Sequence, residues 1–70
     1  MDLDLVRTFV SVADLGQFQE AATDLGVTQQ AVSKRIAALE RALGVRLFVR
    51  VAARGVRLTL DGQAFLPHAR

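Results

Sequence analysis

The chain has no cysteine, tryptophan or tyrosine, and it carries a single histidine and a single proline. Without cysteine it forms neither disulfide bonds nor thiolate metal sites, which fits a reducing compartment. One histidine leaves the usual metal clusters without enough ligands. No apolar stretch approaches the roughly 20 residues that cross a bilayer, and no signal-peptide pattern opens the chain. These absences predict a soluble, cytoplasmic protein with no metal, no cofactor and no membrane contact.

Basic and acidic residues are unevenly distributed along the 70 residues, although the formal net charge is only +2. Positions 1–25 hold one basic residue against five acidic ones, a balance of −4. Positions 26–70 hold eight basic residues, seven of them arginine, against two acidic ones, a balance of +6. Arginine forms paired hydrogen bonds with phosphate and with guanine. The asymmetry is typical of a nucleic-acid-binding domain, although ribosomal and membrane-surface proteins share it.

Two helical patterns separated by a short turn occupy positions 18–43. The first has the i, i+3, i+4, i+7 spacing of a helix with one buried stripe, at Phe18, Ala21, Ala22 and Leu25. Gly26 is suited to end this helix in a left-handed conformation, and Thr28 is suited to cap the next one. This layout predicts a helix-turn-helix.

The second helix of this pair, starting at Gln29, has two separate faces. Its apolar stripe consists of Val32, Ile36, Leu39 and Leu43. Its other face carries small, amide, hydroxyl or cationic side chains, at Gln29, Gln30, Ser33, Lys34, Ala37 and Arg41. A solvated helix face usually mixes Glu and Lys pairs, whereas this one has a single acid, Glu40, at its edge. We interpret this face as a surface for reading DNA bases, with ordinary solvation as the alternative.

The flanking segments complete the architecture. A first helix, capped by Asp2 or Asp4 and stopped near Gly16, is predicted from its apolar positions, Leu3, Val6, Phe9, Val10 and Ala13. Positions 46–51 and 56–59 alternate charged or polar and apolar residues, so they predict a two-stranded hairpin, turning at 52–55 with Arg54 near its tip. Thr59 is suited to cap a last helix that begins near Asp61. Pro67 is expected to bend or interrupt that helix.

The predicted fold is therefore mainly α: a winged helix-turn-helix with a three-helix core, a two-stranded β-hairpin wing and the start of a linker helix. We expect residues 1–60 to form the DNA-binding domain and residues 61–70 to begin the linker helix. Because the last helical pattern reaches Arg70 without a closing signal, we expect the protein to continue beyond this point.

Motifs along nearly the whole chain resemble the N-terminal DNA-binding domain of LysR-type transcriptional regulators. They are Phe9-Val10, Val12-Ala13, Gly16, Phe18, Ala21-Ala22, Leu25, Val27-Thr28-Gln29, Ala31-Val32-Ser33, Ile36, Leu39-Glu40, Leu43-Gly44, Leu47-Phe48, Arg50, Leu58-Thr59 and Gly62. The resemblance implies a bacterial regulator with a homodimer or tetramer held by paired linker helices. It also implies a small-molecule effector bound only by a further domain. The sequence departs from the family at Gln30, where proline is common, and at Gln17, where serine is common.

Groove geometry assigns roles to the exposed residues of this pattern. A recognition helix enters the major groove by its N-terminal end, so we expect Gln29, Gln30, Ser33 and Lys34 to contact base edges. We expect Thr28 to meet a phosphate at the helix N-terminus, Arg50 to hold the DNA backbone beside the wing, and Arg54 to reach the minor groove or its phosphates. For Arg50, a structural salt bridge with an acid is the alternative.

Other residues are assigned structural roles or none. Arg35 lies behind the reading face and is predicted to be structural, and the four phenylalanines are predicted to lie in the core. His68 is given no role. The carboxylates of Asp14, Glu20 and Asp24 have no nucleophile or ligand set to act with, so an enzyme is not expected.

Two functions are compatible with this pattern. The first is sequence-specific binding of double-stranded DNA with an interrupted palindromic site. The alternative is a winged helix that serves as a protein-interaction module, because this fold hosts both uses.

Overall fold

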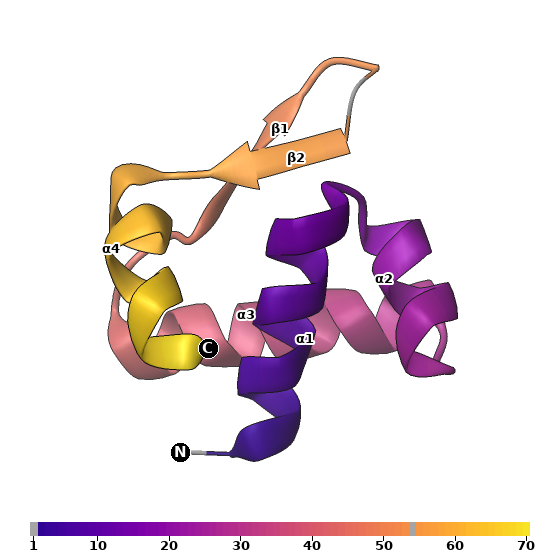
Figure 1. The fold of residues 1–70 in the computed structure, drawn as a ribbon, viewed down its shortest axis with the longest axis horizontal. Helices are drawn as coiled ribbons and strands as arrows, with labels where there is room; N and C mark the ends of the chain where they lie inside the picture. The colour runs from indigo at the N-terminus through magenta and orange to yellow at the C-terminus, as the bar shows by residue number, and fades with distance from the viewer. Residues whose placement is uncertain (1, 54) are drawn as a thin grey trace.

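The structure, a computed structural model, describes residues 2–53 and 55–70, so Arg54 of the predicted wing tip lies outside the described residues. The described residues form, in chain order, α1 (Leu3–Leu15), α2 (Phe18–Leu25), α3 (Gln29–Leu43), β1 (Phe48–Val51), β2 (Gly55–Leu58) and α4 (Leu60–Ala69). The predicted fold class is confirmed: three helices precede an antiparallel hairpin, and a further helix follows it (Figure 1).

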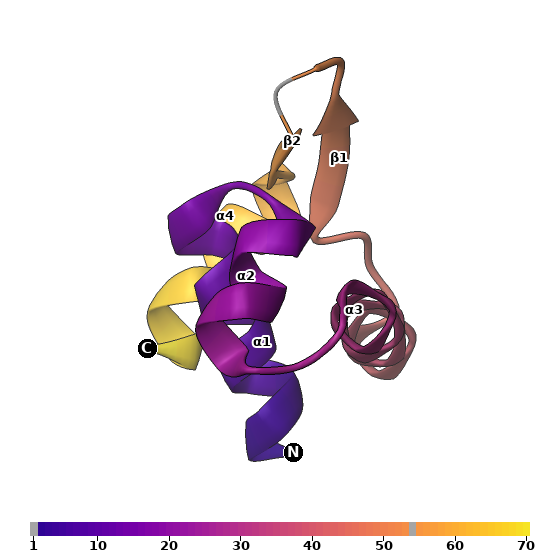
Figure 2. The same ribbon diagram turned by 90° about the vertical axis from the view of Figure 1, so that its right-hand side faces the viewer.

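The three helices of the core surround a single apolar centre. In Figure 1, α1 crosses in front of α3, with α2 beside it and α4 on its other flank. The hairpin projects from one side of this assembly. Figure 2 shows α3 nearly end-on at the edge of the domain, with β1 rising next to it. One long side of α3 is therefore left uncovered beside the wing.

The helix ends follow the local chemistry of the sequence. Asp2 caps α1 by accepting a hydrogen bond of 2.8 Å from the backbone N–H of Asp4, so Asp2 is the capping residue of the two candidates. Gly26 ends α2 with φ +70°, and Thr28 caps α3 through its hydroxyl oxygen, as predicted. Gln17, which precedes α2, makes no side-chain capping hydrogen bond within the described part of the chain.

The hairpin is shorter at its base than the sequence predicts. Its register places Phe48 opposite Leu58 and Val51 opposite Gly55. The predicted first strand began at Arg46, but β1 begins two residues later. The predicted second strand ended at residue 59, but β2 runs from 55 to 58.

Other hydrogen bonds explain the late start of β1. The carbonyl oxygen of Arg46 accepts a 2.6 Å bond from the hydroxyl of Thr59, and the backbone N–H of Leu47 donates a 2.7 Å bond to Glu40. These groups are therefore not available for a strand ladder. Thr59 is the residue before α4, and its hydroxyl oxygen also accepts a 2.9 Å bond from the backbone N–H of Gly62, which confirms its predicted capping role.

Pro67 is expected from the sequence to bend or interrupt the last helix, and it does not interrupt α4. This helix runs from Leu60 to Ala69, and beyond the proline the backbone N–H of Arg70 donates a 3.2 Å bond to the carbonyl of Leu66. Proline removes its own N–H donor, and its ring crowds the carbonyl oxygen of the residue four positions earlier. The residue one turn earlier, Gln63, is exposed, so water can satisfy its carbonyl oxygen.

Phenylalanines from four elements meet at the centre of the domain. The ring of Phe9 in α1 is fully buried and lies 5.4 Å from that of Phe48 in β1 and 5.1 Å from that of Phe65 in α4, centroid to centroid. Phe18 in α2 packs edge-on against Phe48 at 6.3 Å. All four therefore belong to the core or pack against it, as predicted.

Gly62 allows the first turn of α4 to approach the base of the wing. A Cβ atom at this position would lie 2.3 Å from the carbonyl oxygen of Leu47 and 2.9 Å from a methyl group of Leu58. Helix propensity alone favours alanine over glycine by about 1 kcal/mol. The steric contact with a backbone atom opposes this gain, because the backbone of Leu47 is fixed by hydrogen bonds on both sides.

We therefore expect Gly62→Ala to lower the free energy of unfolding by about 1–3 kcal/mol, the usual cost of overpacking. Urea denaturation measures the change. Gln63→Ala is the matched control, since Gln63 is exposed in the same helical turn, and it should be neutral within about 0.5 kcal/mol. A Gly62→Ala protein as stable as the wild type would show that the close approach of α4 to Leu47 does not require glycine at position 62.

Candidate nucleic-acid interface

The four residues predicted to contact bases lie together at the N-terminal end of α3. Gln29, Gln30, Ser33 and Lys34 are all exposed, and together they line one open surface pocket. They share this face because residues three and four apart lie one above the other on a helix. The structure thus brings all four side chains to a single surface that contains no acidic residue.

The N-terminus of α3 is suited to meet an anion. Its first backbone N–H groups have no partner within the helix, and the helix dipole makes this end positive. No acidic side chain lies in the first turn to offset that charge. Thr28 accepts a 3.1 Å hydrogen bond from the backbone N–H of Ala31, so its own hydroxyl hydrogen remains available as a donor.

A groove separates α3 from the wing and brings a fifth predicted residue beside the others. The groove has a volume of about 270 Å³, and its lining includes Ser33 and Glu40 from α3 together with Arg46 and Arg50 from the wing side. Arg50 is exposed on β1. Among the described residues two ion pairs form, and neither includes Arg50, so its alternative role as a structural salt bridge finds no support in this part of the chain.

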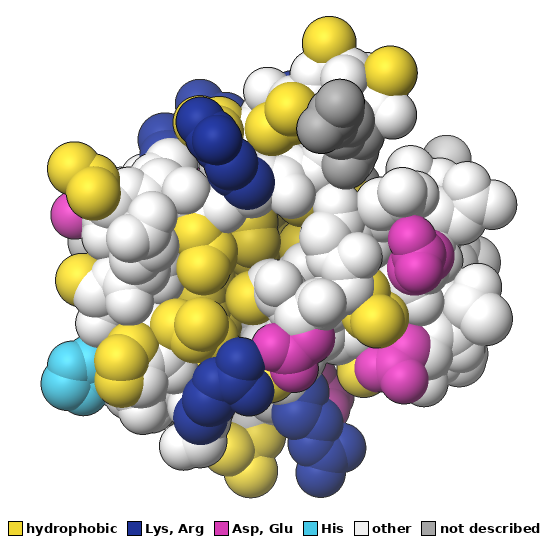
Figure 3. Space-filling model, turned by 45° about the horizontal axis from the view of Figure 1, so that its top comes forward, with side chains coloured by type: hydrophobic (Ala, Val, Ile, Leu, Met, Phe, Trp, Pro, Cys, Tyr) yellow, Lys and Arg dark blue, Asp and Glu magenta, His cyan; other side chains and the backbone are white. Residues whose placement is uncertain are grey.

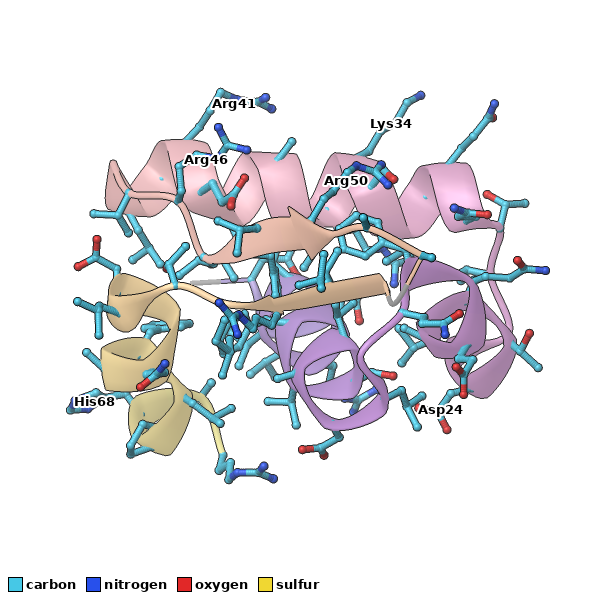
Figure 4. All side chains as sticks on the ribbon, turned by 90° about the horizontal axis from the view of Figure 1, so that it is seen from above. Asp24, Lys34, Arg41, Arg46, Arg50 and His68 are labelled. Atoms are coloured by element: carbon cyan, nitrogen blue, oxygen red, sulfur yellow. The ribbon has the colours of Figure 1, made fainter. Side chains whose placement is uncertain are left out.

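Arg35 points into the domain, in line with its predicted structural role. It is half-buried, and its guanidinium donates a 3.4 Å hydrogen bond to the hydroxyl of Thr8, which is fully buried in α1. Arg35 therefore ties α3 to α1. Its neighbour Lys34 points outward instead (Figure 4).

Two further arginines lie on this side of the domain. The sequence placed Arg41 on the reading face without giving it a contact of its own, and it did not assign Arg46 to the site. Figure 4 shows Arg41 extending from α3 on the same side as Lys34, with Arg46 close by at the start of the wing. Arg41 follows Lys34 by about two helical turns, so the helical period places it on the same face. Arg46 precedes the wing, and only the folded connection brings it alongside α3.

Among the described residues, Glu40 is the one acidic residue that lines the two pockets on this side of the domain. Figure 3 shows Asp and Glu side chains on the side of the domain formed by α2, and in Figure 4 Asp24 lies on the opposite side of the domain from Lys34 and Arg41. Within residues 2–53 and 55–70, no group of histidine and carboxylate side chains could hold a metal ion. No helix in the described ranges is both long and apolar enough to span a bilayer.

Comparison with known proteins gives one consistent result. The sequence model of the bacterial regulatory helix-turn-helix proteins of the lysR family matches residues 3–63. An uncharacterized HTH-type transcriptional regulator of Azotobacter vinelandii, from the ibpB-leuC intergenic region, is 56% identical over 69 residues, covering 99% of this chain and 47% of the relative. The HTH-type transcriptional regulator PecT of Dickeya dadantii is 49% identical over 70 residues, covering all of this chain and 22% of PecT.

Solved structures agree with the sequence relatives. The chain superposes on the CbnR DNA-binding domain, solved in complex with DNA, with a TM-score of 0.94 and 40% identity over all of this chain and 79% of that one. It superposes on the BenM DNA-binding domain, solved with the benA site 1 DNA, with a TM-score of 0.90 and 35% identity over 99% of this chain and 76% of that one.

The family model ends within the first half of α4, whereas these relatives and solved structures cover 99–100% of this chain. The chain spans less than half the length of the curated relatives that it matches. The family model matches residues 3–63, and these regulators are 56% and 49% identical to the chain. The chain therefore belongs to the lysR family of bacterial regulatory helix-turn-helix proteins.

Proposed function

We propose that this chain binds double-stranded DNA in a sequence-specific manner as part of a LysR-type transcriptional regulator. The observation that carries the proposal is the exposed pocket lined by Gln29, Gln30, Ser33 and Lys34 at the positive end of α3. The fold leaves this end of α3 uncovered beside the wing, as a recognition helix in the major groove requires. The CbnR and BenM domains, which share the fold and were solved with DNA, support the same reading.

Each side chain has a chemistry suited to its proposed role. The amides of Gln29 and Gln30 can form paired hydrogen bonds with adenine, and Lys34 can donate to guanine or to a phosphate. Ser33 can hydrogen-bond to several base edges. Thr28, with the first N–H groups of α3, would hold a phosphate at the rim of the groove.

The wing would contact the adjoining backbone or minor groove. Arg50 faces α3 across the groove described above, so a DNA strand held against both walls would be contacted by the recognition helix and the wing together. A role for Arg54 at the minor groove follows from its place in the sequence between the two strands. Contacts of this kind position the domain and do not read sequence directly.

The domain boundaries and the assembly are also part of the proposal. We infer that residues 1–60 form the DNA-binding unit and that residues 61–70 begin a linker helix. Leu60 and Leu3 are 83% and 72% exposed, and Figure 3 shows hydrophobic side chains gathered between α1 and α4. These exposed apolar side chains on α1 and α4 suit pairing of linker helices in a homodimer or tetramer that binds an interrupted palindrome. An effector would bind to the remainder of a longer cytoplasmic protein.

Selection from a random double-stranded DNA library tests the proposal directly. We expect the protein to enrich a defined half-site, with an affinity that falls steeply between two salt concentrations because phosphate contacts release counterions. Enrichment of two half-sites in inverted orientation would also support the dimer. If no sequence is enriched and salt has no effect, the basic surface meets another partner, and the protein-interaction module becomes the better account.

The neighbours Lys34 and Arg35 provide a matched pair of substitutions. We expect Lys34→Ala to weaken binding to the enriched half-site by about 5–150-fold, equivalent to about 1–3 kcal/mol for one base contact, with an unchanged free energy of unfolding. Arg35→Ala should instead change the stability of the domain. It should lower the free energy of unfolding by about 0.5–1.5 kcal/mol, because the hydrogen bond between α3 and α1 is lost while the Thr8 hydroxyl keeps its 2.6 Å bond to the carbonyl of Asp4. It should leave the salt dependence of binding unchanged. Fluorescence anisotropy with labelled DNA and urea denaturation measure the two effects. Wild-type affinity in Lys34→Ala would remove this residue from the proposed site.

A further inference from the structure

Glu40 receives three backbone hydrogen bonds from the segment that connects α3 to the wing. Its carbonyl oxygen accepts from the N–H groups of Gly44 at 2.8 Å and Val45 at 3.3 Å. Its carboxylate oxygen Oε2 accepts from the N–H of Leu47 at 2.7 Å. All three bonds hold the connection against Glu40. Of the three, the bond from the Leu47 N–H to the Glu40 carboxylate is the one at the base of the wing.

Leu47 is the point where the wing meets the rest of the domain. Its side chain is fully buried. Its carbonyl oxygen accepts a 2.9 Å bond from the N–H of Thr59, which follows β2, and it lies against Gly62 in α4. Holding the Leu47 peptide in place therefore holds the ends of both strands. Of these anchors, the Glu40 carboxylate is the one that comes from α3.

The ion pair of Glu40 is a weaker candidate for this task. Nε of Arg46 lies 3.8 Å from Oε2, and the Arg46 side chain is 80% exposed whereas that of Glu40 is 18% exposed. Exposed ion pairs of this kind contribute little, because solvent screens them. A carboxylate beside the reading face also repels phosphate, so its charge alone would weaken DNA binding.

We propose that Glu40 is a positioning residue that sets the orientation of the wing relative to α3. It does so through the hydrogen bond from its carboxylate to the Leu47 N–H, and not through its charge. This orientation determines whether Arg50 and the reading face of α3 contact one DNA duplex at the same time. The consequence for DNA rests on the proposed function, whereas the orientation itself is a property of the free protein.

Two substitutions separate the effect of the length of the Glu40 side chain from the effect of its charge. Glu40→Gln removes the charge but keeps a side-chain oxygen that can accept from Leu47 at the same distance. Glu40→Asp keeps the charge but withdraws the carboxylate by about 1.5 Å, the length of one carbon–carbon bond. Arg46→Ala is the control for the ion pair, because it leaves the bond between Glu40 and Leu47 in place.

Residual dipolar couplings of backbone amides in the DNA-free protein measure the orientation of the wing. We expect the couplings of β1 and β2 in Glu40→Gln and Arg46→Ala to fit the wild-type orientation relative to α3, and those in Glu40→Asp to depart from it. The proposal is wrong if Glu40→Asp keeps the wild-type orientation. It is equally wrong if Arg46→Ala reorients the wing, because the ion pair would then hold it.

Binding to the half-site enriched by the wild-type protein tests the consequence for DNA. We expect Glu40→Asp to bind about tenfold more weakly, equivalent to about 1.4 kcal/mol. We also expect the slope of log affinity against log salt to fall by about 1, as for the loss of one phosphate contact. Arg50→Ala should show the same two changes, and the Glu40→Asp/Arg50→Ala double variant should show no further loss.

Glu40→Gln should bind at least as tightly as the wild type. Additive losses in the double variant would show that Glu40 acts independently of Arg50. Wild-type affinity in Glu40→Asp together with tighter binding by Glu40→Gln would show that Glu40 acts only as a charge. Either result would contradict the proposal. If the wild-type protein enriches no DNA, the proposed function fails, and the dipolar couplings still decide the role of Glu40.

Discussion

The packing of Phe9 against Phe48 and Phe65 is the interaction on which the rest of the domain depends. It joins α1, β1 and α4 at one buried point, and Phe18 extends the contact to α2. Removal of a buried phenylalanine typically costs about 3–5 kcal/mol. A domain of this size has a total stability of only about 4–10 kcal/mol, at 0.05–0.15 kcal/mol per residue. The hairpin is therefore part of the core and not an appendage to it.

This central packing leaves α3 free to use its outer side. Val32, Ile36 and Leu39 bury the inner face of the helix against the core, so the polar residues of the other face are held in place by a rigid element. Hydrogen bonds at Leu47, and one of 2.9 Å from the N–H of Val56 to the carbonyl of Gly16, fix the wing at two places. The recognition helix and the wing therefore hold their relative positions in the DNA-free protein, which lowers the conformational entropy lost on binding.

The features that sequence alone predicted are those governed by near neighbours. The left-handed turn at Gly26, the cap at Thr28 and the shared face of Gln29 to Lys34 depend on residues within a few positions of one another. The start of β1 could not be predicted, because it depends on a hydrogen bond from Leu47 to a side chain seven positions earlier. The helix continues past Pro67 because one lost hydrogen bond near an exposed helix end costs little. The proximity of Arg50 to α3 required the fold itself.

The most direct test of the account is an NMR titration of the isotope-labelled domain with a duplex that carries its enriched half-site. The account predicts that the largest amide shifts occur at Thr28, in the first two turns of α3 and around Arg50 in β1. Amides of the acidic side formed by α2, including Asp24, should change little. Shifts concentrated on α2, or on the apolar face between α1 and α4, would show that the domain meets its partner through another surface and would contradict the account.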